Sequence, residues 1–197
     1  MISKLSERLT GKMLSGGAIS DEDKELYIYG LFMLLSQIMF FIITCILGVI
    51  LNCTLESVLF YIAFQFIRKY AGGYHASTET RCEIMSTLSI LACIVVIRLS
   101  KTYDFQTVLL AVSAAAAGCI SVLCPLDTPE KPLSESEFKY FRKISLIILF
   151  VIIAVITVSY IFSFKAMLVP CCMSLILEAV LISAGKIKKY YTAKQTE

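Results

Sequence analysis

The chain has 197 residues, of which 58% are hydrophobic and 17% charged, with a mean hydropathy of +0.81 and a formal net charge of +3. A soluble domain of this length would expose much of that apolar surface, so the composition argues against one and indicates a multi-span membrane protein. The small positive charge does not indicate nucleic-acid binding, because the basic residues are spread over positions beside the apolar runs.

Residues 1–15 are predicted to form an amphipathic helix, because Ile2, Leu5, Leu9 and Met13 recur at helical spacing among polar residues. The helix is expected either on the membrane surface or packed on the protein's own loops. No cleavable signal peptide is expected, since the first long apolar run begins only at Leu26.

Six apolar segments follow, at residues 26–51, 55–67, 84–97, 105–124, 144–162 and 166–184. Four are close to or above the ~20 residues that a bilayer requires. The other two, at 55–67 and 84–97, are shorter, and one or both of them are expected to be tilted, broken or re-entrant. The prediction is an all-α polytopic membrane helical bundle that forms a single domain over residues 1–197.

The loops alternate in charge along the chain. Most of the 18 Lys and Arg residues lie in the N-terminal arm, the loop around 68–81, a Pro-rich and basic loop at 125–143, and a basic tail at 185–197. The opposite loops hold Arg98, Lys101 and Lys165. By the positive-inside rule, both termini, the loop around 68–82 and the Pro-rich loop are expected to face the cytoplasm.

Residues 75–82, His75-Ala76-Ser77-Thr78-Glu79-Thr80-Arg81-Cys82, form a polar segment between two apolar runs. His75 is the only histidine, so zinc-finger and HExxH spacings are excluded and neither a metal nor another cofactor is expected. A Cys and His pair can perform nucleophilic acyl transfer, because the thiolate attacks while the imidazole moves the proton. A lone histidine in a loop is, however, more often only a polar loop residue.

The two residues must be brought together by a break in the chain. In one straight helix they would lie two turns, roughly 10.5 Å, apart, too far for proton transfer. Gly72 and Gly73 permit a bend, and Ser77 or Thr78 is predicted to cap a helix that continues through Cys82. The helix dipole would then favour the thiolate.

Other residues could support this chemistry. Backbone N–H groups at the glycines or at the helix start are candidate oxyanion donors. Glu79, Gln65 and Asp127 are candidates to orient the imidazole, although each is more readily explained by a structural role. Glu178, inside the last apolar run, is a functional hypothesis by default, but pairing with a basic residue at the cytoplasmic edge, such as Lys186, is the preferred explanation.

The stretch Arg68-Lys69-Tyr70-Ala71-Gly72-Gly73-Tyr74-His75-Ala76-Ser77, followed by Cys82, resembles the signature of the accessory gene regulator B (AgrB) family of bacterial quorum-sensing peptidases. Chain length, hydropathy, the basic N-terminal arm and the proline loop ending Glu-Lys-Pro are also similar. The resemblance implies that Cys82 is the nucleophile and His75 its base. It further implies an AgrD propeptide as substrate, cleavage through a thioester, cyclisation to a thiolactone or lactone, and a homodimer in the bacterial cell membrane.

Two other functions remain open. One is a small transporter or exporter subunit, which the scarcity of intramembrane charge and the lack of inverted repeats disfavour. The other is a non-catalytic membrane scaffold. Replacement of Cys82 separates both from a peptidase.

Overall fold

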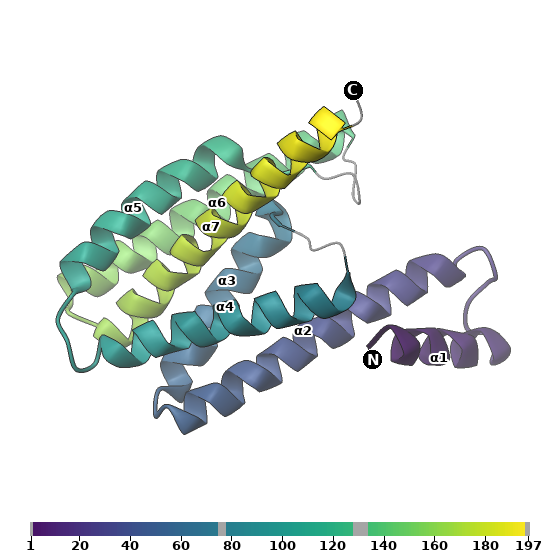
Figure 1. Ribbon diagram of the computed structural model, residues 1–197, viewed down its shortest axis with the longest axis horizontal. Helices are drawn as coiled ribbons and strands as arrows, with labels where there is room; N and C mark the ends of the chain where they lie inside the picture. The colour runs from purple at the N-terminus through teal and green to yellow at the C-terminus, as the bar shows by residue number, and fades with distance from the viewer. Residues whose placement is uncertain (1, 75–77, 128–133, 196–197) are drawn as a thin grey trace. The chain divides into compact units, whose positions relative to one another are not determined.

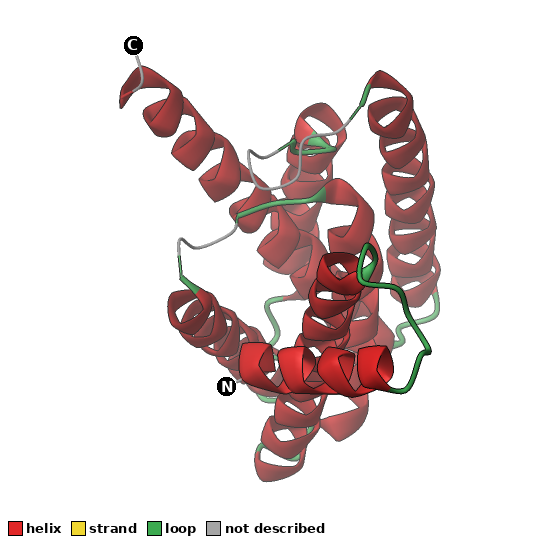
Figure 2. Cartoon of the chain, turned by 90° about the vertical axis from the view of Figure 1, so that its right-hand side faces the viewer, coloured by secondary structure: helices red, strands yellow, loops and turns green. Residues whose placement is uncertain are grey.

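The computed structural model describes residues 2–74, 78–127 and 134–195, and over these ranges it contains helices and connecting loops (Figure 2). The helices are labelled in Figure 1. They are α1 (Ile2–Ser15), α2 (Lys24–Ile50), α3 (Thr54–Ala71), α4 (Glu79–Leu99), α5 (Gln106–Leu123), α6 (Glu135–Ile161) and α7 (Lys165–Gln195). The all-α prediction is confirmed.

Five of the described helices are long and apolar enough to cross a membrane: α2, α4 from Thr80, α5, α6, and α7 as far as Tyr191. The protein is therefore a multi-pass membrane protein. The helix α3 corresponds to the second predicted segment, 55–67, and it is not one of these five. It carries Glu56, Arg68 and Lys69 within 18 residues, more charge than a typical spanning segment.

The chain divides into two compact units, residues 1–43 and 44–197. The first holds α1, which confirms a helix in the predicted place, and most of α2. The hydroxyl of Ser6 donates to the carbonyl of Ser3, and that of Thr10 donates to the carbonyl of Ser6, in each case about one turn earlier. The position of α1 on the membrane surface stays a prediction.

The second unit is built around α7. Helices α3, α5 and α6 pack against it, and α3 also packs against α6. Long side chains such as Leu168, Leu175 and Ile182 are buried on α7. On α5 the buried residues include Ser113, Ala116 and Ala117, small side chains that let helices approach closely inside a membrane.

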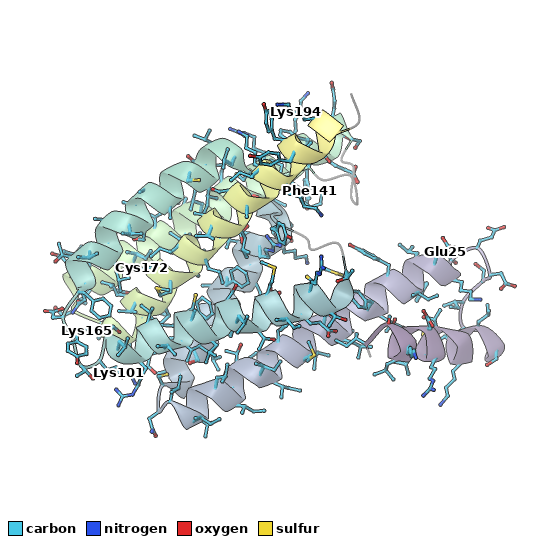
Figure 3. The ribbon with its side chains drawn as sticks, viewed as in Figure 1. Glu25, Lys101, Phe141, Lys165, Cys172 and Lys194 are labelled. Carbon is cyan, nitrogen blue, oxygen red and sulfur yellow. The ribbon has the colours of Figure 1, made fainter. Side chains whose placement is uncertain are left out.

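At one end of this second unit, two loops and α3 are joined by charged groups. The ammonium group of Lys101 lies 2.7 Å from the Glu56 carboxylate and donates to the carbonyl of Asn52 at 3.2 Å. Lys165 lies 3.9 Å from Asp104. Figure 3 shows Lys101 and Lys165 at this end, far from Phe141 and Lys194. The loops after α2, α4 and α6 therefore gather together, as the predicted alternation requires.

At the other end, the segment after α3 meets the segment after α5 and the C-terminal half of α7. The N–H of Leu126 donates to the carbonyl of Ala71 at 2.9 Å, and Lys189 lies 3.4 Å from the carboxylate of Asp127. Since α3 begins near Lys101 and ends near Leu126, it runs the full length of the unit.

Four predicted segments had wrong boundaries, each because polar residues continue a helix. The segments at 55–67 and 84–97 are the apolar parts of α3 and α4, which are unbroken helices of 18 and 21 residues. The loop predicted at 125–143 ends at Ser134, where a capping box with Glu137 starts α6. The predicted tail at 185–197 continues α7 to Gln195, because Lys, Ala and Gln are good helix formers.

Candidate active site

Cys82 lies in the first turns of α4. Thr78 has an extended backbone, and its hydroxyl accepts the N–H of Arg81 at 3.4 Å, while its carbonyl accepts the N–H of Cys82 at 3.0 Å. The predicted cap at Thr78 is thus confirmed. Glu79 is the first residue of α4. His75 and Ser77 lie outside the described residues, so their predicted roles stay predictions.

The side chain of Cys82 is half-buried, and the helix around it exposes apolar residues. Ile84, Met85 and Leu88 are all exposed, whereas Ile90 and Ile94 are buried further along α4. Cys82 therefore lies in a part of α4 whose apolar side chains are exposed, unlike the buried part that follows it.

The bend, residues 72–74, follows directly after α3. Gly72 and Gly73 both have positive φ, 80° and 139°, a region that side chains with a Cβ rarely adopt. The N–H of Gly72 still bonds to the carbonyl of Arg68, at 3.2 Å. The two glycines therefore stop the helix and turn the chain, which confirms that a bend precedes His75.

Two other segments hold the bend through backbone hydrogen bonds. The N–H of Tyr74 donates to the carbonyl of Leu181 on α7 at 2.9 Å, and the N–H of Leu126 donates to that of Ala71. Leu181 lies inside α7, the most buried helix of the unit, so its carbonyl ties the bend to that helix. The backbone that leads into His75 is thereby fixed on α7.

The close approach at these contacts requires glycine at three positions. A Cβ on Gly72 would lie 2.8 Å from the carbonyl oxygen of Leu126. On α7, a Cβ on Gly185 would lie 2.9 Å from the nitrogen of Tyr74 and would also overlap the side chain of Leu126. A Cβ on Gly73 would overlap the guanidinium of Arg68.

Arg68, in the last turn of α3, donates hydrogen bonds to two backbone carbonyls of the bend. Its Nη1 donates to the carbonyl of Gly72 at 2.6 Å and its Nη2 to the carbonyl of Tyr74 at 2.7 Å. We call this pair of hydrogen bonds the Arg68 clamp. Charge-assisted bonds of this kind are short and strong, so the clamp fixes both sides of Gly73 at once.

Glu178 on α7 is fully buried, and its carboxylate lies 4.0 Å from Nη1 of Arg68. Its partner is therefore Arg68, and not Lys186, which the sequence had suggested as a possible basic partner. Lys186 is eight residues further along α7, about 12 Å at 1.5 Å per residue. The basic residue that does meet Glu178 comes from α3, which packs along α7.

Two of the three candidates for orienting His75, Gln65 and Asp127, have other partners in the structure. The amide of Gln65 donates to the hydroxyl of Tyr61, one turn earlier on α3, at 2.9 Å. Asp127 pairs with Lys189, which also donates to its carbonyl at 3.1 Å. Both contacts are structural, and any role of these residues beside His75 stays a prediction.

Two other cysteines, Cys124 and Cys119, differ from Cys82 in burial or in partners. Cys124 follows α5 close to the bend and is fully buried, and burial raises the pKa of its thiol. A thiol that resists ionisation is a poor nucleophile. Cys119 meets the hydroxyl of Ser183 at 3.4 Å.

Sequence reasoning missed the roles of Leu126 and Gly185, and did not match Glu178 to Arg68. A single acid in an apolar run was the signal for Glu178, and a glycine within a helix was an available signal for Gly185. No local pattern could pair residues of α3 and α7.

Comparisons with known proteins agree with the family suggested by the sequence. The family model described as accessory gene regulator B matches residues 6–182. An AgrB-like protein 2 of Clostridium perfringens strain 13 is 28% identical over 156 residues, 76% of this chain and 72% of that protein. An AgrB-like protein of strain SM101 gives the same identity and coverage. No solved structure matches the chain.

Proposed function

Because the chain belongs to the accessory gene regulator B family of membrane cysteine endopeptidases, we propose that it cleaves an AgrD-like propeptide at Cys82 and closes the peptide into a ring. Family membership implies the membrane location, the peptidase class and the propeptide substrate. The observation that supports the site is a half-buried Cys82 beside the capped start of α4, next in sequence to a bend held on α7.

The proposed reaction has two acyl transfers. His75 takes the proton of the Cys82 thiol, and the sulfur attacks the carbonyl carbon of the scissile peptide bond. The C–N bond breaks, His75 gives its proton to the leaving amine, and the C-terminal fragment departs. A thiol or hydroxyl within the propeptide then attacks the thioester, which forms the ring and returns the proton and the free thiol to Cys82.

The oxyanion of each step requires N–H donors. The N–H groups of Gly72 and Tyr74 are already bonded, to Arg68 and Leu181. The start of α4 is the better source, because the first N–H groups of a helix have no partner within it. We assign the role to the backbone of Glu79 and Thr80.

Ring closure requires that water stay away from the acyl-enzyme. Exchange of one thioester for another is close to neutral in free energy, so hydrolysis would win in open solvent. Apolar side chains next to Cys82, among them Ile84 and Met85, would lie in the bilayer boundary and keep water out. Cys82 and His75, the two proposed catalytic residues, belong to the same chain. The homodimer implied by the family resemblance remains an expectation.

The end of the second unit that carries the bend is proposed to face the cytoplasm. The last turns of α7 carry four lysines, Lys186, Lys188, Lys189 and Lys194. The positive-inside rule places such a basic cluster on the cytoplasmic side.

A cysteine introduced for Tyr103, exposed in the opposite loop, should react with an impermeant maleimide in intact cells. One introduced for Tyr190, exposed on α7, should react only after permeabilisation. The reverse pattern would contradict this orientation, and the parent chain gives the background labelling.

Proteoliposomes separate a peptidase from a transporter. The purified chain is incubated with a synthetic AgrD-like propeptide, and peptides inside and outside the vesicles are identified by mass spectrometry. We expect a free C-terminal fragment and a ring. Intact propeptide that accumulates in the lumen without fragments would favour the transporter, and neither product nor accumulation would favour a scaffold.

A further inference from the structure

We propose that Glu178 is a positioning residue of the active site, which acts through Arg68 to hold the bend before His75. The proposal rests on the proposed function and deepens it. It adds a residue from α7, far from the polar segment 75–82 in sequence, to a site whose proposed parts otherwise lie within residues 68–82. Glu178 itself touches no reacting atom in this account.

The burial of Glu178 requires an explanation. Its side chain is 0% exposed, and neither carboxylate oxygen has a hydrogen-bond partner among the described residues. A buried carboxylate without compensation is costly, so a residue of this kind inside an apolar helix points to a functional or pairing role. The cation that faces it is Arg68, 4.0 Å away.

The guanidinium of Arg68 is held by the bend. Its side chain is only 18% exposed, and its two Nη atoms are committed to the carbonyls of Gly72 and Tyr74. The carboxylate of Glu178 therefore attracts the guanidinium from the α7 side while the two carbonyls hold it from the bend. At short range in a low-dielectric setting this attraction is strong, and it sets the position of the clamp relative to α7.

The same helix turn holds the bend a second time. Leu181 lies three residues after Glu178, on the neighbouring position of the same face of α7, and its carbonyl accepts the N–H of Tyr74. One turn of α7 thus fixes the bend through an ion pair and a backbone hydrogen bond. Loss of the ion pair leaves the guanidinium without its counterion and lets the bend move against α7.

The test is Glu178→Gln, which keeps the size of the side chain and removes its charge. Displacement of a catalytic group by about 1 Å can cost roughly 100-fold in rate, and we expect a loss of that order in single-turnover cleavage of the propeptide. Arg68→Gln should give a similar loss. The double variant should be no slower than Arg68→Gln alone, because two residues that act as one unit are not additive.

The matched control is Glu56→Gln. Glu56 also lies on a helix of the second unit and forms an ion pair, with Lys101, but at the opposite end. The same chemical change there should leave the cleavage rate within about twofold of the wild type. Glu178→Asp keeps the charge and should recover a large part of the activity that Glu178→Gln loses.

Amide hydrogen exchange gives a readout that needs no substrate. In Glu178→Gln we expect faster exchange at Tyr74 and Leu126, whose N–H groups bond across the bend, and unchanged exchange in the middle of α5 and α6. This measurement tests the clamp even if Cys82→Ala were found to process the propeptide, an outcome that would remove the proposed function alone.

A wild-type cleavage rate in Glu178→Gln, additive losses in the double variant, or unchanged exchange at Tyr74 would each overturn the proposal. If Glu178→Gln fails to accumulate in the membrane, Arg68→Lys carries the test. A lysine keeps the positive charge opposite Glu178 but cannot bond two carbonyls as a fork. Wild-type activity in Arg68→Lys would then refute the role of the clamp.

Discussion

Cys82→Ala is expected to abolish release of the C-terminal fragment, with a fall in rate of at least about 1,000-fold, since removal of the nucleophile removes covalent catalysis altogether. Cys82→Ser should be nearly as inactive, because a hydroxyl is a far weaker nucleophile than a thiolate. The variants are co-expressed with an AgrD-like propeptide and the fragment is quantified by mass spectrometry, after the membrane level of each variant has been equalised.

The matched control is Cys45→Ala. Cys45 is half-buried, as Cys82 is, but lies on α2. Its replacement should leave processing unchanged. Processing by Cys82→Ala at the rate of Cys45→Ala would show that the thiol of residue 82 takes no part in the chemistry.

Gly73→Ala is expected to reduce processing by about 100-fold, through displacement of the bend and not through loss of a reacting group. A Cβ at residue 73 would occupy the place of the Arg68 guanidinium, and the φ of 139° would be strained for alanine. The clamp and the backbone before His75 must therefore shift. Single-turnover cleavage measures the effect.

Gly118→Ala on α5 serves as the control for this change. A Cβ there would have nothing within 4 Å, and alanine is the better helix former, so the variant should process the propeptide at the wild-type rate. Equal rates for Gly73→Ala and Gly118→Ala would mean that the geometry of the bend does not matter for catalysis.

The sequence alone predicted the features that depend on local chemistry. Apolar runs identified six helices of the bundle, and the glycines identified the bend after α3. The preference of helix starts for hydroxyl side chains located the cap at Thr78. Each of these signals lies within a few residues of the feature it predicts, so no knowledge of packing is needed.

Features set by tertiary packing were not predictable in the same way. Glu178 was recognised as unusual, but its partner depends on how α3 packs on α7, and that packing brings Arg68 within 4.0 Å of it. The contact of Gly185 with the bend depends on the same packing. Helix ends were also misjudged, because hydropathy marks where apolar residues stop and not where the helix stops.

The most direct test of the account is the detection of an acyl-enzyme on Cys82. The wild-type chain in lipid nanodiscs is mixed briefly with the propeptide whose ring-forming residue is replaced by alanine, so that the thioester cannot pass to the ring. Intact mass and peptide mapping should then find the N-terminal part of the propeptide on Cys82, released by hydroxylamine and absent in Cys82→Ala. Cleavage of the propeptide with no labile adduct on Cys82, or with the adduct on another residue, would contradict the central claim.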